Sequence, residues 1–64
     1  MRLKFIGEDG SMGLKHGKWY TCKVRTVADR VYVSWLIVDE NGRKIGQKSC
    51  PYESFAAMLK NWEE

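Results

Sequence analysis

The chain has 64 residues, of which 44% are hydrophobic, and its formal net charge is +3. This length allows one domain with a small core, residues 1–64, and argues against a deep catalytic pocket, while the hydrophobic and aromatic content excludes a disordered tail. The first residues, MRLKFIG, reach charge and glycine too early for a signal peptide, and no run of about 20 apolar residues predicts a membrane helix. We therefore expect a folded domain in the cytoplasm.

Two segments, residues 2–6 (RLKFI) and 19–26 (WYTCKVRT), alternate apolar and polar side chains. A period of two is typical of a strand with one buried and one exposed face. Each segment therefore predicts a half-buried strand. The side chains expected to face the core are those of Leu3, Phe5, Tyr20, Cys22 and Val24.

The loop between these strands, residues 10–18, contains three glycines and ends in Lys18. A phosphate-binding loop needs a glycine, four residues, a second glycine, a lysine and then Ser or Thr. Met12 stands where the first glycine belongs, and Trp19 stands where the hydroxyl belongs. We therefore interpret the glycines as turn residues, with Gly17 leading into the next strand.

Residues 31–38 (VYVSWLIV) are rich in apolar groups on both faces, which predicts the central strand with both sides at least partly covered. Asn41 and Gly42 then predict a tight hairpin turn. This turn returns the chain as a fourth strand through RKIGQKS, residues 43–49. Gly46 inside that strand indicates a bulge or a sharp bend.

The C-terminal segment predicts an amphipathic helix over about residues 52–62. Pro51 suits the first turn of a helix, and Glu53 lies where the helix dipole favours a negative charge. Apolar residues follow at spacings i, i+3, i+4 and i+7, which form one stripe of a helix surface. The stripe consists of Phe55, Met58, Leu59 and Trp62. We expect it to be buried against strand residues such as Val33 or Trp35, closing the domain.

The segment LKHGKWYTCKV, residues 14–24, resembles the Leu-x-x-Gly-Lys-x-Tyr-x-Val signature with which many small Src-homology-3-like barrels enter their second strand. The end segments KFIGEDGSMGLKHGKWY and CPYESFAAMLKNW resemble a group of short phage and prophage proteins, many without assigned function. In that group a Cys-Pro-Tyr-x-Ser step precedes a short helix that ends in Asn-Trp.

The resemblance implies a mainly β fold, a small Src-homology-3-like barrel of four or five antiparallel strands with a C-terminal helix. It also implies a phage or prophage origin, and hence the cytoplasm of a bacterial host cell. It implies no reaction. The proline-rich peptide binding of signalling barrels is not carried over, because MRLKFIG and the basic LKHGK depart from their pattern.

Neither a metal site nor a catalytic site is predicted. The only soft metal ligands are His16, Cys22 and Cys50, and their spacings match no zinc pattern. The two cysteines fit reduced thiols in a cytoplasmic protein. Carboxylates such as Asp39 and Glu40 lie in a turn, where such side chains bond their own backbone. We therefore expect a protein that is not an enzyme and that uses no cofactor.

The strongest functional signal is a set of basic residues beside aromatic ones, which we take as candidate binding residues. The set comprises Lys15, Lys18, Trp19, Lys23, Arg25, Tyr32, Lys44 and Lys48. Because the second, third and fourth strands are expected to be neighbours, their outward-pointing cations should share one face. These cations are Lys23, Arg25, Lys44 and Lys48.

Three interpretations of this basic face stay open. The leading one is a non-catalytic binding module that acts through a protein–protein interaction with an acidic partner surface. The alternative is a nucleic-acid-binding accessory protein, in which cations hold phosphates of DNA or RNA and rings stack on bases. In the third, the lysines are ordinary solvated residues and Trp19 caps the core.

Overall fold

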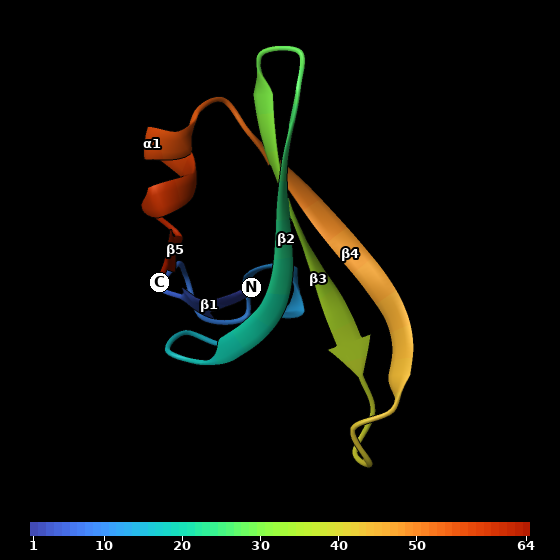
Figure 1. Cartoon of the computed structure of the whole chain (residues 1–64). Helices are drawn as coiled ribbons and strands as arrows, with labels where there is room; N and C mark the ends of the chain where they lie inside the picture. The colour runs from blue at the N-terminus through green and yellow to red at the C-terminus, as the bar shows by residue number, and fades with distance from the viewer.

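The structure is a computed structural model that describes residues 1–64. Five antiparallel strands form one sheet in the order β4-β3-β2-β1-β5 (Figure 1). The strands are β1 (Arg2–Phe5), β2 (Trp19–Val27), β3 (Arg30–Val38), β4 (Lys44–Tyr52) and β5 (Trp62–Glu63), and the one α-helix is α1 (Phe55–Leu59). The expected mainly β fold of antiparallel strands with a C-terminal helix is confirmed. The sheet is not closed, because β4 and β5 are its two edges, so the Src-homology-3-like barrel is not confirmed.

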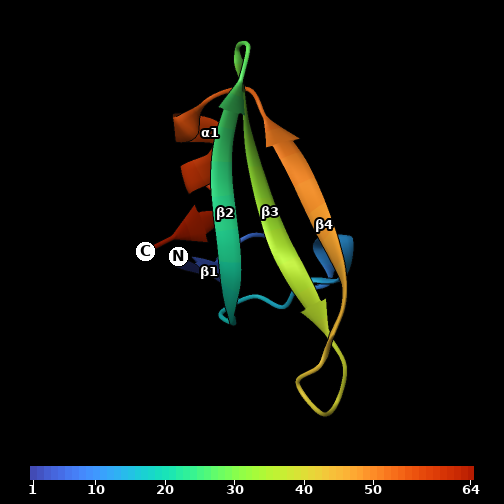
Figure 2. The same cartoon turned by 45° about the vertical axis from the view of Figure 1, so that its right-hand side comes forward.

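The long strand β2 is shared between two parts of the sheet. Its residues 19–21 pair with β1. Its pairing with β3 begins only at Cys22, which lies opposite Trp35, and continues to Val27. Residues 19–21 of β2 and 36–38 of β3 are therefore not paired with each other. The two strands diverge at this end of the sheet (Figure 2).

Side chains that alternate along the strands meet on one side of the sheet and form the core. They are joined there by residues of the first loop and of α1, and the core comprises Leu3, Phe5, Leu14, Cys22, Val31, Val33, Trp35, Tyr52, Met58 and Trp62. Trp62 is fully buried. The ring centroids of Phe5, Trp35 and Tyr20 lie 5.1, 5.7 and 6.1 Å from its own. Tyr20 and Val24 pack half-buried against this core, so the inward direction expected for the first two strands is confirmed.

The C-terminal helix is shorter than the expected span of residues 52–62. β4 continues to Tyr52, so Pro51 lies in an edge strand rather than in the first helical turn. Ser54 is the N-cap, and its Oγ accepts a 3.1 Å hydrogen bond from the backbone N–H of Ala57. This cap starts the helix at Phe55. Trp62 lies beyond its end, in β5. A helix of this length is too short to cross a membrane.

The expected burial of the helical stripe is correct at two positions and wrong at two. Met58 and Trp62 are 6% and 0% exposed. Phe55 and Leu59 are 51% and 54% exposed. A helix of five residues covers little more than one turn, so only the side around Met58 and Ala57 reaches the sheet. Phe55 and Leu59 lie one turn apart on the solvent side.

The predicted hairpin between β3 and β4 is present, and Asp39 organises its turn. The Oδ1 atom of Asp39 accepts hydrogen bonds of 2.9 Å from the backbone N–H groups of Asn41 and Arg43. Gly42 has a φ of +80°, a conformation that favours glycine. Asp39 and Asn41-Gly42 therefore act as turn residues, as their sequence pattern predicts.

The predicted irregularity near Gly46 is a bulge in β4. Ile37 lies opposite Gly46, but Val38 lies opposite Lys44, so Ile45 is an extra residue in the strand. A bulge of one residue reverses the side to which the residues before it point. Lys44 therefore points to the side of the sheet opposite to that of Lys48, although in a regular strand residues four positions apart point to the same side.

Candidate binding surfaces

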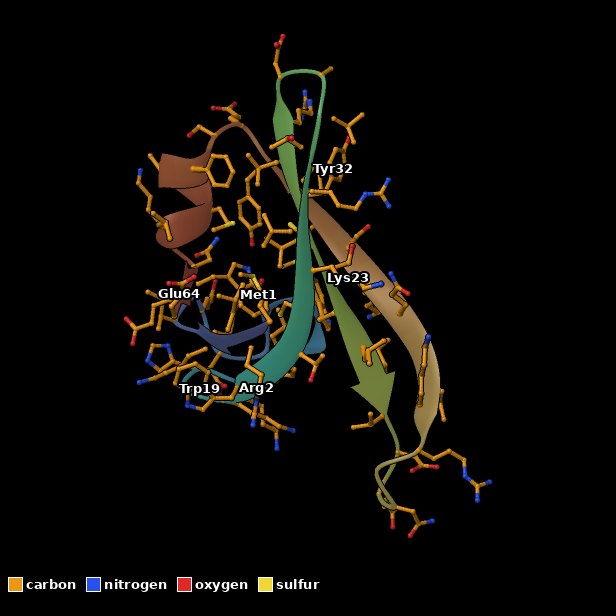
Figure 3. All side chains as sticks on the ribbon, viewed as in Figure 1. Met1, Arg2, Trp19, Lys23, Tyr32 and Glu64 are labelled. Carbon is orange, nitrogen blue, oxygen red and sulfur yellow. The ribbon has the colours of Figure 1, made fainter.

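One face of the sheet is uncovered, on the side opposite the core and α1. The register places Lys23 opposite Ser34 and Arg25 opposite Tyr32. Figure 3 shows Lys23 and Tyr32 projecting from the side of the sheet that faces away from α1. This surface is named the strand face here. The register places on it the polar and aromatic residues Lys23, Arg25, Arg30, Tyr32, Ser34, Lys44, Gln47 and Ser49, together with the apolar residues Val27, Leu36 and Val38.

Three cations of the strand face border two shallow hollows that meet at Ser34. Lys23 and Lys44 border the first hollow. Arg25 and Tyr32 border the second. No acidic side chain lines either hollow. The structure therefore brings together three of the four cations that were expected to share a face, with Tyr32 among them.

None of these three cations has an acidic partner. The one ion pair of the chain joins the Nζ atom of Lys4 to the Oε1 atom of Glu63 at 3.5 Å, on β1 and β5. Two acids flank β3: Asp29 precedes Arg30 and forms no ion pair, and Asp39 follows Val38, where the turn holds its Oδ1 atom. The strand face is consequently a positive surface that nothing within the chain neutralises.

Lys48 does not belong to the strand face, and its expected position is wrong. It lies opposite Trp35, on the core side of the sheet. The bulge at Ile45 explains the error, because without it Lys44 and Lys48 would point to the same side. Lys48 instead lines a cleft together with Lys15 and Lys18.

Trp19 is also separated from the strand face. The first residues of β2 bend away from β3, and Figure 3 shows Trp19 and Arg2 projecting at the far end of the sheet from Tyr32. Trp19 is 43% exposed and is not part of the core, so it does not cap the core. The two aromatic candidates therefore lie on different parts of the surface.

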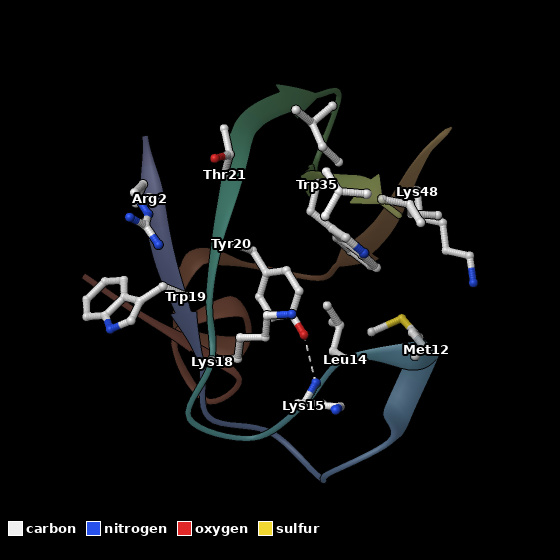
Figure 4. Close-up of a pocket in the computed structure, with 14 residues that line it drawn as sticks. Arg2, Met12, Leu14, Lys15, Lys18, Trp19, Tyr20, Thr21, Trp35 and Lys48 are labelled. Atoms are coloured by element: carbon white, nitrogen blue, oxygen red, sulfur yellow. Dashed lines mark hydrogen bonds between the residues drawn. The ribbon is translucent and has the colours of Figure 1, made fainter. Parts of the chain in front are cut away.

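A cleft of about 350 Å³ opens where β2 and β3 diverge (Figure 4). Leu14, Tyr20 and Trp35 provide an apolar lining. The charged residues that line it are all basic, namely Arg2, Lys15, Lys18 and Lys48. The sequence indicated all three of these lysines as binding residues but not this cleft, because the cleft depends on where the pairing of β2 with β3 stops.

Tyr20 is fixed in the cleft by two basic residues. Its hydroxyl accepts a 2.9 Å hydrogen bond from the backbone N–H of Lys15, drawn as a dashed line in Figure 4. The Nζ atom of Lys18 lies 5.4 Å from the centroid of its ring, a cation–π distance. The loop before β2 is thus held against the strand that it precedes.

The soft metal ligands lie apart from one another. His16 is exposed in the first loop, and its Nδ1 atom is 2.9 Å from the carbonyl oxygen of Gly7. Cys22 and Cys50 are free thiols, the first buried and the second half-buried. Burial raises the pKa of Cys22, against smaller opposing effects of a backbone hydrogen bond from Leu3 and the N-terminal ammonium group. No group of three or more His, Cys, Asp or Glu side chains gathers in the chain.

Comparison with protein-family models, with curated proteins and with solved structures gives no match for this chain. A fold by itself does not assign an activity. The function is therefore inferred from the chemistry of the two surfaces, the strand face and the cleft.

Proposed function

We propose that this protein is a non-catalytic binding module that holds an acidic surface of a protein partner against its strand face. One observation carries the proposal: Lys23, Arg25 and Lys44 lie unpaired on one uncovered sheet face, which also carries the ring of Tyr32 beside Arg25. Complementary charge steers association and disfavours wrong partners. A tyrosine ring among polar side chains is a common anchor of protein interfaces.

The binding of nucleic acid by the same face is the second candidate. Proteins that hold single strands stack successive bases on neighbouring rings. Tyr32 is the only ring on the strand face. Tyr32 lies opposite Arg25 of β2. Trp19 lies six residues before Arg25 on the same strand, which is about 20 Å of extended chain. Adjacent bases cannot stack on both rings across that distance, and this favours the protein partner.

A Src-homology-3-like architecture and an origin in a phage or prophage also belong to this proposal. The resemblance of the end segments supports both. Such an architecture agrees with the order of elements along the chain: a short strand, a long loop, three long antiparallel strands, a short helix and a last short strand. The cytoplasm of a bacterial cell would then be the place where the strand face meets its partner.

The test uses two variants that change the net charge equally. Lys23→Glu/Arg25→Glu reverses the charge of the strand face, and Arg43→Glu/Lys60→Glu makes the same change at the β3–β4 turn and after α1. The parent and both variants are immobilised and exposed to bacterial lysate with and without nuclease. We expect the parent to retain one or more proteins whose binding does not change after nuclease treatment. The Arg43→Glu/Lys60→Glu variant should retain the same proteins, and the strand-face variant should lose them. Loss from both variants, or no selective retention, would contradict the proposal.

Oligonucleotide binding at two salt concentrations decides the second candidate. If the strand face holds phosphates, affinity falls by roughly 0.9 log units per log unit of salt for each duplex contact. The absence of binding by the parent at low salt rules this candidate out. Tight and steeply salt-dependent binding that the strand-face variant abolishes would replace the protein partner by a nucleic acid.

A further inference from the structure

The cleft lies between two strand edges that are not paired with each other. The backbone N–H of Cys22 donates a 2.7 Å hydrogen bond to the carbonyl of Met1, so the backbone groups of Cys22 face away from β3. Backbone groups alternate in direction along a strand, so those of Thr21 and Trp19 face toward β3. Since the pairing with β3 starts only at Cys22, this edge of β2 opens into the cleft.

The opposite edge of the cleft belongs to residues 36–38 of β3. These residues have β4 as a neighbour on one side only. The gap extends over three residues of each strand, or about 10 Å of extended chain. An unpaired strand edge is a template for an added strand. The cleft therefore matches a short extended segment and is too small for a folded partner.

The charges around the cleft select an acidic occupant. Its four cations, Arg2, Lys15, Lys18 and Lys48, have no acidic residue beside them in the lining and take part in no ion pair. Beneath them, Leu14 and Trp35 are 1% and 3% exposed and form an apolar floor. An occupant that fits both features carries negative charge together with apolar side chains.

The rings of the cleft favour a peptide over a nucleic acid. Lys18 already lies over the ring of Tyr20, and Trp35 is buried. Trp19 also lines the cleft, but Figure 4 shows its ring on the other side of β2 from Tyr20. The cleft therefore offers one free ring at its rim and no pair of neighbouring free rings on which successive bases could stack. Alternating backbone donors and acceptors, in contrast, match the backbone of an extended peptide.

We propose that the cleft binds an extended peptide segment whose carboxylate side chains meet the four cations and whose backbone adds as a short strand beside β2 or β3. This site adjoins the first hollow of the strand face, with which it shares Thr21, Trp35 and Leu36, but its four cations are not residues of the strand face. It takes one short segment by its backbone, whereas the strand face takes a charged surface. Either site can therefore exist without the other.

The probe is the peptide acetyl-Glu-Val-Glu-Val-Glu-amide, titrated into the ¹⁵N-labelled full chain and followed by NMR. We expect amide shifts at residues 19–21 and 36–38 and none at Lys23, Arg25 or Tyr32. The same peptide with Gln in place of Glu tests the charge. The same peptide with methylated backbone nitrogens tests strand addition. Both altered peptides are expected to bind at least about tenfold more weakly, since each removes one class of contact.

Two variants of the chain complete the test. Lys15→Glu/Lys48→Glu should weaken binding of the acidic peptide by about tenfold or more, because two attractive charges become repulsive. Arg43→Glu/Lys60→Glu changes the net charge equally, away from the cleft, and should bind the peptide as the parent does. Both variants must keep the dispersed NMR spectrum of the folded parent.

Four results would overturn the proposal: no shifts at the highest soluble peptide concentration, equal binding of the methylated peptide, shifts confined to Lys23, Arg25 and Tyr32, or equal weakening in both variants. A five-nucleotide oligothymidylate is titrated in parallel. If it shifts the amides of residues 19–21 and 36–38 more strongly than the peptide does, the occupant is a nucleic acid and the peptide is excluded.

Discussion

The indole N–H of Trp62 donates a 3.0 Å hydrogen bond to the hydroxyl of Tyr52, and both side chains are buried in the core. This bond links β5 to the end of β4. In Tyr52→Phe, the indole N–H would stay buried without a partner, which costs about 1–3 kcal/mol. We expect the free energy of unfolding, measured with urea, to fall by that amount. Tyr32→Phe removes a hydroxyl that bonds to nothing in the chain and should change stability little; equal losses would contradict the role of this bond.

Two neighbouring residues of α1 should differ sharply in their contribution to stability. Met58 is buried and Leu59 is 54% exposed. Met58→Ala should cost about 2–5 kcal/mol, because it empties a filled part of the core. The free energy of unfolding of a domain of this size is only about 5 kcal/mol in total, so this variant should be largely unfolded at 37 °C. Leu59→Ala should cost well under about 1 kcal/mol. Thermal melts followed by circular dichroism test the pair, and the reverse order of stabilities would show that α1 is rotated about its axis.

Stability should decrease in alkaline solution. Burial raises the pKa of Tyr52 above its ordinary value of 10.0, and burial raises the pKa of Cys22 above 9.0. The folded chain therefore keeps protons on Tyr52 and Cys22 at a pH at which the unfolded chain has released them. The stability that these two groups contribute is fully present below their ordinary pKa values and is lost as the pH rises through their raised pKa values. Urea unfolding between about pH 7 and pH 11 should show a free energy that is level at first and then falls. A smaller fall of the free energy of unfolding in Tyr52→Phe would give the part of the pH dependence that Tyr52 causes. A free energy of unfolding that rises above about pH 9 would contradict the raised pKa values.

The two thiols should react in a fixed order. Cys22 is 1% exposed and its raised pKa keeps the thiol protonated, whereas Cys50 is half-buried. The thiolate is the form that reacts. Under native conditions iodoacetamide should modify Cys50 first, and Cys22 should react only when the chain unfolds. Peptide mass spectrometry after timed quenching reads both sites. Early modification of Cys22 would mean that the core around it opens readily.

Alternation along the strands predicted most of the fold because side-chain burial in a sheet has a strict period of two. Leu3, Phe5 and Cys22 are buried as that period requires. The same alternation predicted the wrong side of the sheet for Lys48, although a bulge near Gly46 was predicted. A single extra residue reverses the parity of the strand, and the sequence does not say on which side of the glycine it falls.

The helix and the cleft were beyond the reach of sequence patterns for different reasons. The apolar spacing alone fits one helical stripe from Phe55 to Trp62. The helix, however, begins only after its N-cap Ser54 and has five residues, so Trp62 lies outside it and Phe55 is exposed. The cleft depends on the place where β2 leaves β3, a property of two strands together. No local pattern around Trp19 or Val38 encodes that separation.

The pairing of β1 with β5 sets the order in which the chain can fold. Lys4 lies opposite Glu63, so this contact closes almost the whole sequence into one loop, whereas the hairpins β2–β3 and β3–β4 close short ones. The entropy of loop closure rises with loop length, so contacts between distant residues form after local ones. We therefore expect the two hairpins to assemble first and the segment that carries Trp62 to dock last. Substitutions in the hairpins should slow refolding, while substitutions around Trp62 should mainly accelerate unfolding.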